Sequence, residues 1–411
     1  MSVGRHGLIA ALDVGSTKVC CFIARAEGDR VRVVGIGHQA AAGVRQGAIT
    51  DMEAAEDAVR AAVDAAERMA GETVREAYVN LSGGFPASHI VGVEVAIAGH
   101  AVRDCDVGRV LHQARVEPEG GERQVVLALP VGYTIDGTSR IRDPRGLYGD
   151  RLGVNLHIVT AASGPIRNLS ISVERGHLGV AGLVPSSYAA GLAALVEDET
   201  DLGVTLIDMG GGTTKLVVFY EGALVHTDLV PLGGGHVTSD IARGLSTPLA
   251  HAERMKTLYG GVAPNRNDEN HMITVPQVGE PEDETARHIP RSALVGIVRP
   301  RIEETIEMVR DRLKASGFDR AAGGRVVLTG GACQLQGVRD MAARMLDKQV
   351  RIGRPIRIQG LAEATCGPAF ATCAGLLAYA LRHEAETLQP VAEAESGGRL
   401  ARIGRWLKEN F

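Results

Sequence analysis

The chain has 411 residues, of which 45% are hydrophobic and 23% are charged, and its formal net charge is −5. This length predicts roughly two to four domains, and the weakly acidic balance argues against a nucleic-acid-binding protein. No run of about 18 apolar residues is present, so no membrane-spanning helix is expected. The six cysteines form no CxxC pair and the histidines show no ligand spacing, which argues against a disulfide framework and a structural metal.

The first 83 residues predict three strands, a helix and a fourth strand. Apolar runs over residues 8–40 are broken at Gly15 and at an EGD turn. A helix is predicted over 52–70, with Asp51 as N-cap and Gly71 as the stop signal. The run EAYVNLSG at 76–83 predicts the next strand.

A similar order recurs from residue 203. Asp13 and Asp208 each end the first strand of their set, and each is followed by glycine, small hydroxyl residues and a lysine. A helix is predicted over 239–260, a long helix over 292–317, and a strand, double glycine and helix over 325–346. This repeat predicts two related α/β halves rather than a solenoid.

Two segments interrupt the repeat. Residues 85–163 contain strand-like runs at 125–135 and 154–161. Residues 226–300 contain an acidic stretch at 267–285 that predicts a solvated hairpin or loop. Residues 385–398 are small and polar, which is typical of a flexible linker.

The glycine turns after the two aspartates predict a polyphosphate site. Turns without bulky side chains let backbone amides approach an anion, and the aspartates can hold Mg²⁺ through water. One such turn is typical of any hairpin, but two matched turns favour binding from both sides of one ligand. The candidate residues in these turns are Asp13, Gly15, Ser16, Thr17, Lys18, Asp208, Gly210, Gly211, Gly212, Thr213 and Thr214, with Gly234 from a later glycine cluster.

Two further patterns are compatible with the nucleoside part of a ligand. Gly330 and Gly331 would permit close approach by a base or ribose, although an ordinary strand–helix turn has the same pattern. Glu253 and Lys256 share one helix face, where they would bind a ribose or form an exposed ion pair. P-loop and dinucleotide-binding motifs are absent.

The last thirteen residues predict an amphipathic helix. On a helical projection the apolar residues cluster within about 80°, with the only tryptophan at their flank and cations opposite. This pattern is typical of a helix at an anionic membrane surface, the alternative being a helix packed on the protein's own core. The apolar residues are Leu400, Ile403, Trp406, Leu407 and Phe411.

The motifs LDVGSTK, IDMGGGTTK and LTGGA resemble the two phosphate hairpins and the adenosine loop of the actin-like ATPase superfamily. The order of segments over residues 7–380, and the tail, resemble the FtsA family of bacterial cell-division proteins more closely. The resemblance implies an actin-like (ribonuclease H-like) two-lobed α/β fold, with ATP and Mg in a cleft between the lobes and a C-terminal amphipathic helix. A small-molecule kinase or a PilM-type pilus-assembly ATPase of the same superfamily is the alternative.

The resemblance also implies a domain layout. Subdomain 1A would comprise 1–84, 164–202 and a return segment at 361–384, and 1C would comprise 85–163. Subdomain 2A would comprise 203–225 and 301–360, and 2B would comprise 226–300. A linker at 385–398 and a membrane-targeting helix at 399–411 would follow.

The same resemblance implies the partners. These are the C-terminal peptide of FtsZ, further copies of the chain in an actin-like filament, the anionic membrane surface and other division proteins, but no nucleic acid. Arg291, Arg299 and Arg301 are the residues carried over for FtsZ. The protein would be peripheral on the cytoplasmic side of the inner membrane at the septum. Many relatives have an acidic residue in place of Lys215, and 182–191 lacks the Glu or Gln that orients water, so at most slow ATP hydrolysis is expected.

Overall fold

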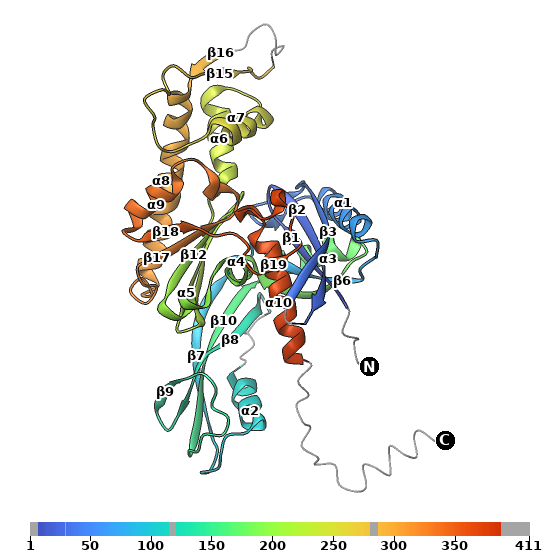
Figure 1. The fold of residues 1–411 in the computed structure, drawn as a ribbon, viewed down its shortest axis with the longest axis vertical. Coiled ribbons are helices and arrows are strands. Elements are labelled where there is room, and N and C mark those ends of the chain that lie inside the picture. Colours follow the sequence, from blue (N-terminus) through green and yellow to red (C-terminus); the bar gives the residue numbers. More distant parts are fainter. Residues whose placement is uncertain (1–6, 29, 115–120, 280–286, 388–411) are drawn as a thin grey trace, which may run out of the picture. The chain divides into compact units, whose positions relative to one another are not determined.

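The computed structural model describes residues 7–28, 30–114, 121–279 and 287–387 (Figure 1). The chain divides into two compact units, Met1–Leu381 and Arg382–Phe411, and only the end of one helix is described in the second unit. Within the described ranges, no helix combines the length and apolar character that crossing a bilayer requires. The first unit contains all of the sheets discussed below.

The first sheet has six strands in the order β11-β6-β1-β2-β3-β19. The three predicted N-terminal strands form its antiparallel part, and β6 and β11 add in parallel. Helix α1 is capped at both ends as predicted: the Asp51 side chain accepts a hydrogen bond from the Ala54 amide at 3.2 Å, and Gly71 is the left-handed C-cap. The bounds are β1 Leu8–Val14, β2 Lys18–Glu27, β3 Arg30–Ala40, α1 Met52–Ala70, β6 Glu76–Leu81, α3 Ser163–Arg175, β11 Gly179–Pro185 and β19 Ile358–Gln359, with a small hairpin of β4 Val44–Arg45 and β5 Ala48–Ile49.

The second sheet repeats this plan, as the sequence repeat predicted. Its order is β14-β13-β12-β17-β18, with β12, β13 and β14 antiparallel and β17 parallel to β12. Helices α8 and α9 pack on its outer face in one apolar core. The bounds are β12 Val204–Met209, β13 Thr214–Tyr220, β14 Ala223–Val230, α8 Arg291–Ala315, β17 Arg325–Thr329, a 3₁₀ turn at Gly331–Gln334, α9 Val338–Leu346 and β18 Gln349–Ile352.

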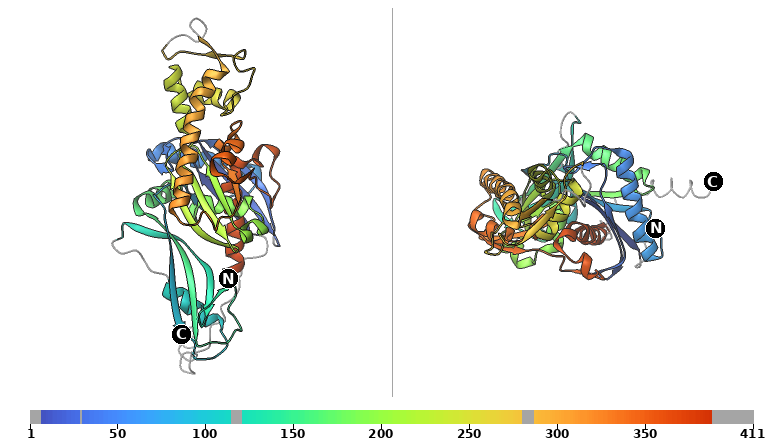
Figure 2. Two further views of the ribbon diagram at one scale, coloured as in Figure 1. Left: turned by 90° about the vertical axis from the view of Figure 1, so that its left-hand side faces the viewer. Right: turned by 90° about the horizontal axis from the view of Figure 1, so that it is seen from above.

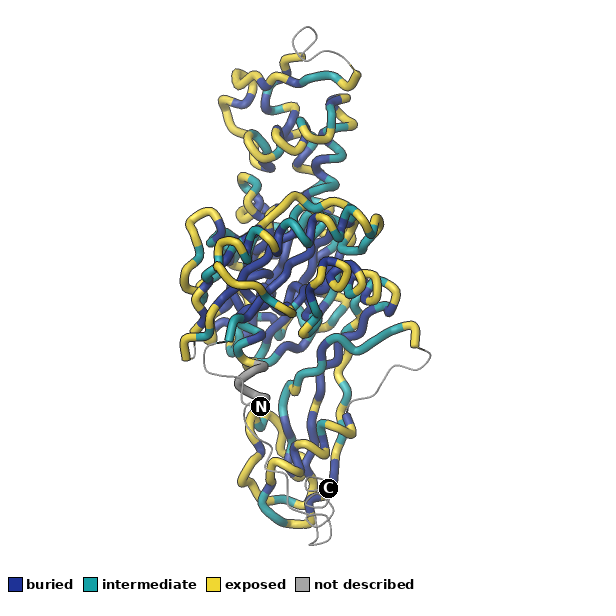
Figure 3. Tube along the Cα trace, turned by 90° about the vertical axis from the view of Figure 1, so that its right-hand side faces the viewer, coloured by how far each residue is buried: buried dark blue, intermediate teal, exposed yellow. Residues whose placement is uncertain are grey.

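Two helices pack between the sheets and join them. Side chains of α4 (Ser186–Ala194) and α10 (Ala371–Thr387) share one apolar core with strands of both sheets. The two helices approach closely, because a Cβ built on Gly375 would lie 1.7 Å from the Ala189 carbonyl oxygen. The central strands are accordingly the most buried part of the unit (Figure 3). A short helix, α5 (Glu197–Leu202), leads into the second sheet.

The segment after β6 forms a separate four-stranded antiparallel sheet in the order β7-β10-β8-β9. The runs predicted at 125–135 and 154–161 fall in β8 and β10, and α2 packs against this sheet through a core of its own. The bounds are β7 Ala87–Ala96, α2 Asp104–Ala114, β8 Arg123–Ile135, β9 Thr138–Ile141 and β10 Arg151–Ala162.

The segment after β14 departs from the prediction of one helix over 239–260. The structure has two helices, α6 (Gly234–Leu245) and α7 (Leu249–Tyr259), because Ser246 is left-handed and Pro248 lacks the amide that a continuous helix needs. The described part of the acidic stretch contains β15 (Met272–Val275), which pairs antiparallel with β16 (Arg287–Pro290) beyond the end of the stretch. Figure 2 shows α8 running from the second sheet to α6 and α7.

Candidate functional site

The first predicted phosphate turn lies between β1 and β2. Its closing hydrogen bond runs from the Gly15 amide to the Lys18 carbonyl oxygen at 3.0 Å. Asn80, at the end of the parallel strand β6, holds the neighbouring Asp13: its amide nitrogen donates to Asp13 Oδ1 at 2.6 Å, and its oxygen accepts from the Val14 amide at 2.7 Å. The carboxylate is therefore fixed from the next strand of the sheet.

The second turn has the same construction. The Gly210 amide donates to the Thr213 carbonyl oxygen at 3.0 Å, and Asp208 ends β12 as Asp13 ends β1. Asp208 is buried and pairs with Lys215, whose Nζ lies 3.3 Å from its Oδ2. Lys215 is its cross-strand neighbour in the ladder of β12 and β13.

The two turns contact one another. A Cβ built on Gly211 would lie 2.3 Å from Thr17 Cγ2, and one on Gly212 would lie 2.5 Å from Ser16 Oγ. Real Cβ atoms do not approach so closely, and this contact accounts for the glycines better than turn geometry alone. Because the turns meet, their amides and hydroxyls face one cavity rather than two.

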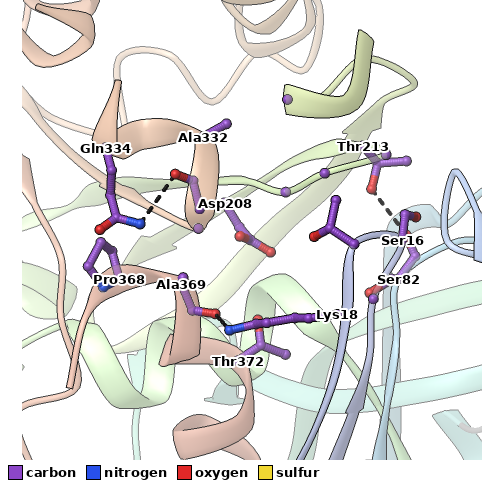
Figure 4. A pocket seen from close by; sticks show the side chains of 18 of the residues that line it. Ser16, Lys18, Ser82, Asp208, Thr213, Ala332, Gln334, Pro368, Ala369 and Thr372 are labelled. Carbon is purple, nitrogen blue, oxygen red and sulfur yellow. Dashed lines mark hydrogen bonds between the residues drawn. The ribbon is translucent and has the colours of Figure 1, made fainter. Parts of the chain in front are cut away.

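That cavity has a volume of about 400 Å³, and residues next to strands of both sheets line it (Figure 4). The phosphate turns form one part of its wall, and the loop after β17 and helix α7 form another. The predicted residues that line it are Asp13, Gly15, Ser16, Thr17, Lys18, Asp208, Gly210, Gly211, Gly212, Thr213, Gly234, Glu253, Lys256, Gly330 and Gly331.

Thr214 is the predicted residue that the structure places elsewhere. Thr213, in the turn, lines the cavity, whereas Thr214, the first residue of β13, faces the core under α8. Sequence reasoning also missed several lining residues, because they come from segments without a phosphate motif. These are Ser82, Thr257, Gly260, Ala332, Gln334, Leu335, Pro368, Ala369 and Thr372, and Lys215, which had been noted only for its charge.

Glu253 and Lys256 form the ion pair that their spacing allows, at the wall of the cavity, and ribose binding stays a prediction. They form an ion pair with 2.7 Å between Lys256 Nζ and Glu253 Oε2, and both line the cavity. Lys256 Nζ also donates to the Gly234 carbonyl oxygen at 3.1 Å and to Thr238 Oγ1 at 2.9 Å. The pair thus fixes α7 against the start of α6 and leaves the Glu253 carboxylate partly exposed.

Burial dominates the electrostatics of the first turn. Burial raises the pKa of Asp13 to about 6, against the opposing effect of the Lys18 and Lys215 ammonium groups. Lys18 Nζ donates to the Ala369 carbonyl oxygen at 2.5 Å and lies 3.2 Å from the centre of the Phe370 ring. Lys18 therefore ties the first turn to the segment that precedes α10.

The three arginines predicted for a peptide partner lie in different environments. Arg291 is buried: its guanidinium pairs with Asp268 at 2.5 Å and donates to Gln336 Oε1 at 2.7 Å. This network is internal, which argues against Arg291 as a contact for a partner. Arg299 is exposed and pairs with Glu303 at 2.7 Å, whereas Arg301 is partly exposed and bound to Asp240 at 2.5 Å.

The predicted membrane helix at 399–411, with Leu400, Ile403, Trp406, Leu407 and Phe411, lies outside the described residues. Residues 385–387 of the predicted linker belong to helix α10, and the rest of the linker lies outside the described residues. Both stay predictions from the sequence.

Comparison with known proteins decides the family. A family model described as "Cell division protein FtsA" matches residues 205–375, and one described as "SHS2 domain inserted in FTSA" matches residues 83–160. Cell division protein FtsA of Agrobacterium fabrum is 45% identical over 100% of this chain and 96% of that protein. The chain belongs to the FtsA family. Two further relatives support the same family. Cell division protein FtsA of Rhizobium meliloti is 46% identical over 99% of this chain and 96% of that protein, and FtsA of Escherichia coli K12 is 33% identical over 98% of each.

Solved structures confirm the actin-like fold of this FtsA-family chain. A chain of the PilM–PilN type IV pilus biogenesis complex has a TM-score of 0.64 at 16% identity, covering 91% of this chain and 98% of its own. MreB5 of Spiroplasma citri bound to AMPPNP has a TM-score of 0.53 at 14% identity, covering 92% and 98%. At these identities the likeness concerns the fold alone. A PilM-type ATPase or a small-molecule kinase is therefore not favoured over a cell-division protein of the FtsA family.

Proposed function

We propose that the cavity binds ATP, and that the protein polymerises and anchors FtsZ filaments to the cytoplasmic membrane at the division site. The observation that carries the proposal is the meeting of the two glycine turns at one cavity. Each turn supplies backbone amides, hydroxyls and an aspartate to the same space, so a triphosphate would be held from both sides. The MreB5 structures that share the fold were solved with AMPPNP and with ADP.

The remaining wall of the cavity suits the nucleoside. Gly330 and Gly331 permit a flat ligand to approach the loop after β17, and Glu253 offers a carboxylate to a ribose hydroxyl. Magnesium, held through water by Asp13 and Asp208, belongs to the same proposal. The stretch 182–191 contains neither Glu nor Gln to orient an attacking water, so hydrolysis would be slow at best.

The attachments of the protein rest on the family and on the sequence. The FtsZ C-terminal peptide is assigned to the surface of α8 around Arg299 and Arg301, where charge-assisted bonds to carboxylates can form. The helix at 399–411 is assigned to the membrane, and a filament would present many such helices at once. The protein would act with further copies of itself and other division proteins as a peripheral protein of the inner membrane.

The nucleotide assignment is tested by filling the cavity. A Cβ built on Gly331 meets only Ala369 Cβ, at 3.9 Å, so Gly331→Leu extends into the cavity without a backbone clash. We expect ATP affinity, measured by calorimetry with MgCl₂ present, to fall at least about tenfold. Gly324→Leu is the matched control, because nothing lies within 4 Å of its Cβ position and it does not line the cavity. ATP affinity that is equal in both variants rejects the assignment.

A further inference from the structure

Lys215 has a position that the proposed function does not use. It lies on β13 opposite Asp208, its side chain is 9% exposed, and it lines the cavity at the second phosphate turn. Its Nζ is 3.3 Å from Asp208 Oδ2 and 3.7 Å from the Cβ position of Gly210. The ammonium group is thus buried directly beside the turn at which phosphates would bind.

The contact that holds Lys215 is weaker than those of the other two lysines that line the cavity. An ammonium group has three donors, and ion-paired hydrogen bonds are typically about 2.7–2.9 Å long. Lys256 has three acceptors between 2.7 and 3.1 Å, and Lys18 has a carbonyl oxygen at 2.5 Å together with an aromatic ring. Lys215 has one long contact among the described residues, so donors remain for a ligand.

The charges around the turns balance without a metal ion. Asp13 and Asp208 contribute two carboxylates, and Lys18 and Lys215 contribute two ammonium groups. A triphosphate therefore approaches a wall with no net formal charge. An acidic side chain in place of Lys215 would leave an excess of negative charge, which a divalent cation would have to neutralise before phosphates could enter.

We infer that Lys215 supplies much of the positive charge that a divalent cation would otherwise bring, so that this protein binds nucleotide phosphates with little dependence on Mg²⁺. The inference rests on the proposed nucleotide site. When nucleotide binds, the Lys215 ammonium group turns from Asp208 towards a phosphate oxygen, because lysine commonly binds phosphate as a point charge. Mg²⁺ can still bind through Asp13 and Asp208, but it is not required for occupancy of the cavity.

The test compares ATP affinity of the full chain in excess MgCl₂ and in EDTA, by calorimetry. For the parent protein we expect the two dissociation constants to agree within about threefold, less than a single close charge interaction would produce. Lys215→Gln should bind at least about tenfold more weakly in EDTA than in MgCl₂, which corresponds to about 1.4 kcal/mol. Lys215→Arg keeps the charge and should stay metal-independent.

Lys256→Gln is the matched control, because it removes the same charge from the nucleoside side of the cavity. It should weaken binding by the same factor in both buffers. A parent protein that binds ATP only with Mg²⁺ overturns the inference while leaving the nucleotide site intact, and this measurement needs no variant. Binding that is absent in both buffers instead rejects the nucleotide site itself. Equal metal dependence in Lys215→Gln and Lys256→Gln also overturns the inference.

Discussion

His157 makes the inserted sheet sensitive to acid. The side chain is fully buried on β10, and its Nε2 lies 2.6 Å from Ser88 Oγ. Ser88 accepts a hydrogen bond from the Thr227 amide at 3.2 Å, so its own hydroxyl hydrogen is available to an unprotonated Nε2. Protonation of His157 would remove this acceptor and bury a charge. Burial, with His226 and His89 nearby, accordingly lowers the pKa of His157 to about 4.

The size and sign of the effect follow from proton linkage. In the unfolded chain the pKa of a histidine is about 6.5, so between pH 6.5 and 4 the unfolded state binds a proton that the folded state does not. The contribution of His157 to the free energy of unfolding is constant above pH 6.5 and falls as the pH falls from 6.5 to 4. Between pH 7.5 and pH 5 the loss from His157 alone is about 2 kcal/mol.

Native-state hydrogen exchange can localise this loss. Protection of the β10 amides, corrected for intrinsic exchange rates, should fall about 25-fold from pH 7.5 to pH 5 in the parent protein beyond any fall in His157→Gln. The pKa of His226 is also lowered by burial, and this adds to the loss of protection in both proteins. The difference between the two proteins therefore isolates His157. His112→Gln, at an exposed position of α2, should behave as the parent. A His157→Gln variant that loses as much protection as the parent refutes the reasoning.

Two further predictions concern the attachments. Arg299→Glu with Arg301→Glu should weaken binding of an FtsZ C-terminal peptide and reduce its salt dependence, measured by fluorescence anisotropy, because two cations facing the peptide are lost. Normal peptide binding in this double variant would place the peptide site elsewhere. Arg291→Ala should instead lower the melting temperature, because it leaves the buried Asp268 carboxylate without its partner. Trp406 emission should shift to the blue on anionic vesicles, and deletion of 399–411 should abolish vesicle co-sedimentation. An emission spectrum indifferent to lipid would contradict the assignment of the tail.

The sequence by itself determined the local features of this protein. Asp51 and Gly71 marked both ends of α1, and the two aspartates with their glycine turns marked the phosphate hairpins, because capping and tight turns depend on residues a few positions apart. The repeat also predicted two related sheets. The break between α6 and α7 had a signal as well, at Pro248, but apolar periodicity on both sides concealed it.

Only the tertiary structure decided which of these features meet. The contact of Gly212 with Ser16 and the entry of Ser82, Ala369 and Thr372 into the cavity join segments hundreds of residues apart. Their positions depend on how the strands of each sheet are ordered and on the packing of α4 and α10 between the sheets. The same packing buried Arg291 within an internal network. A local pattern specifies what a residue can do, whereas long-range packing specifies which groups it faces.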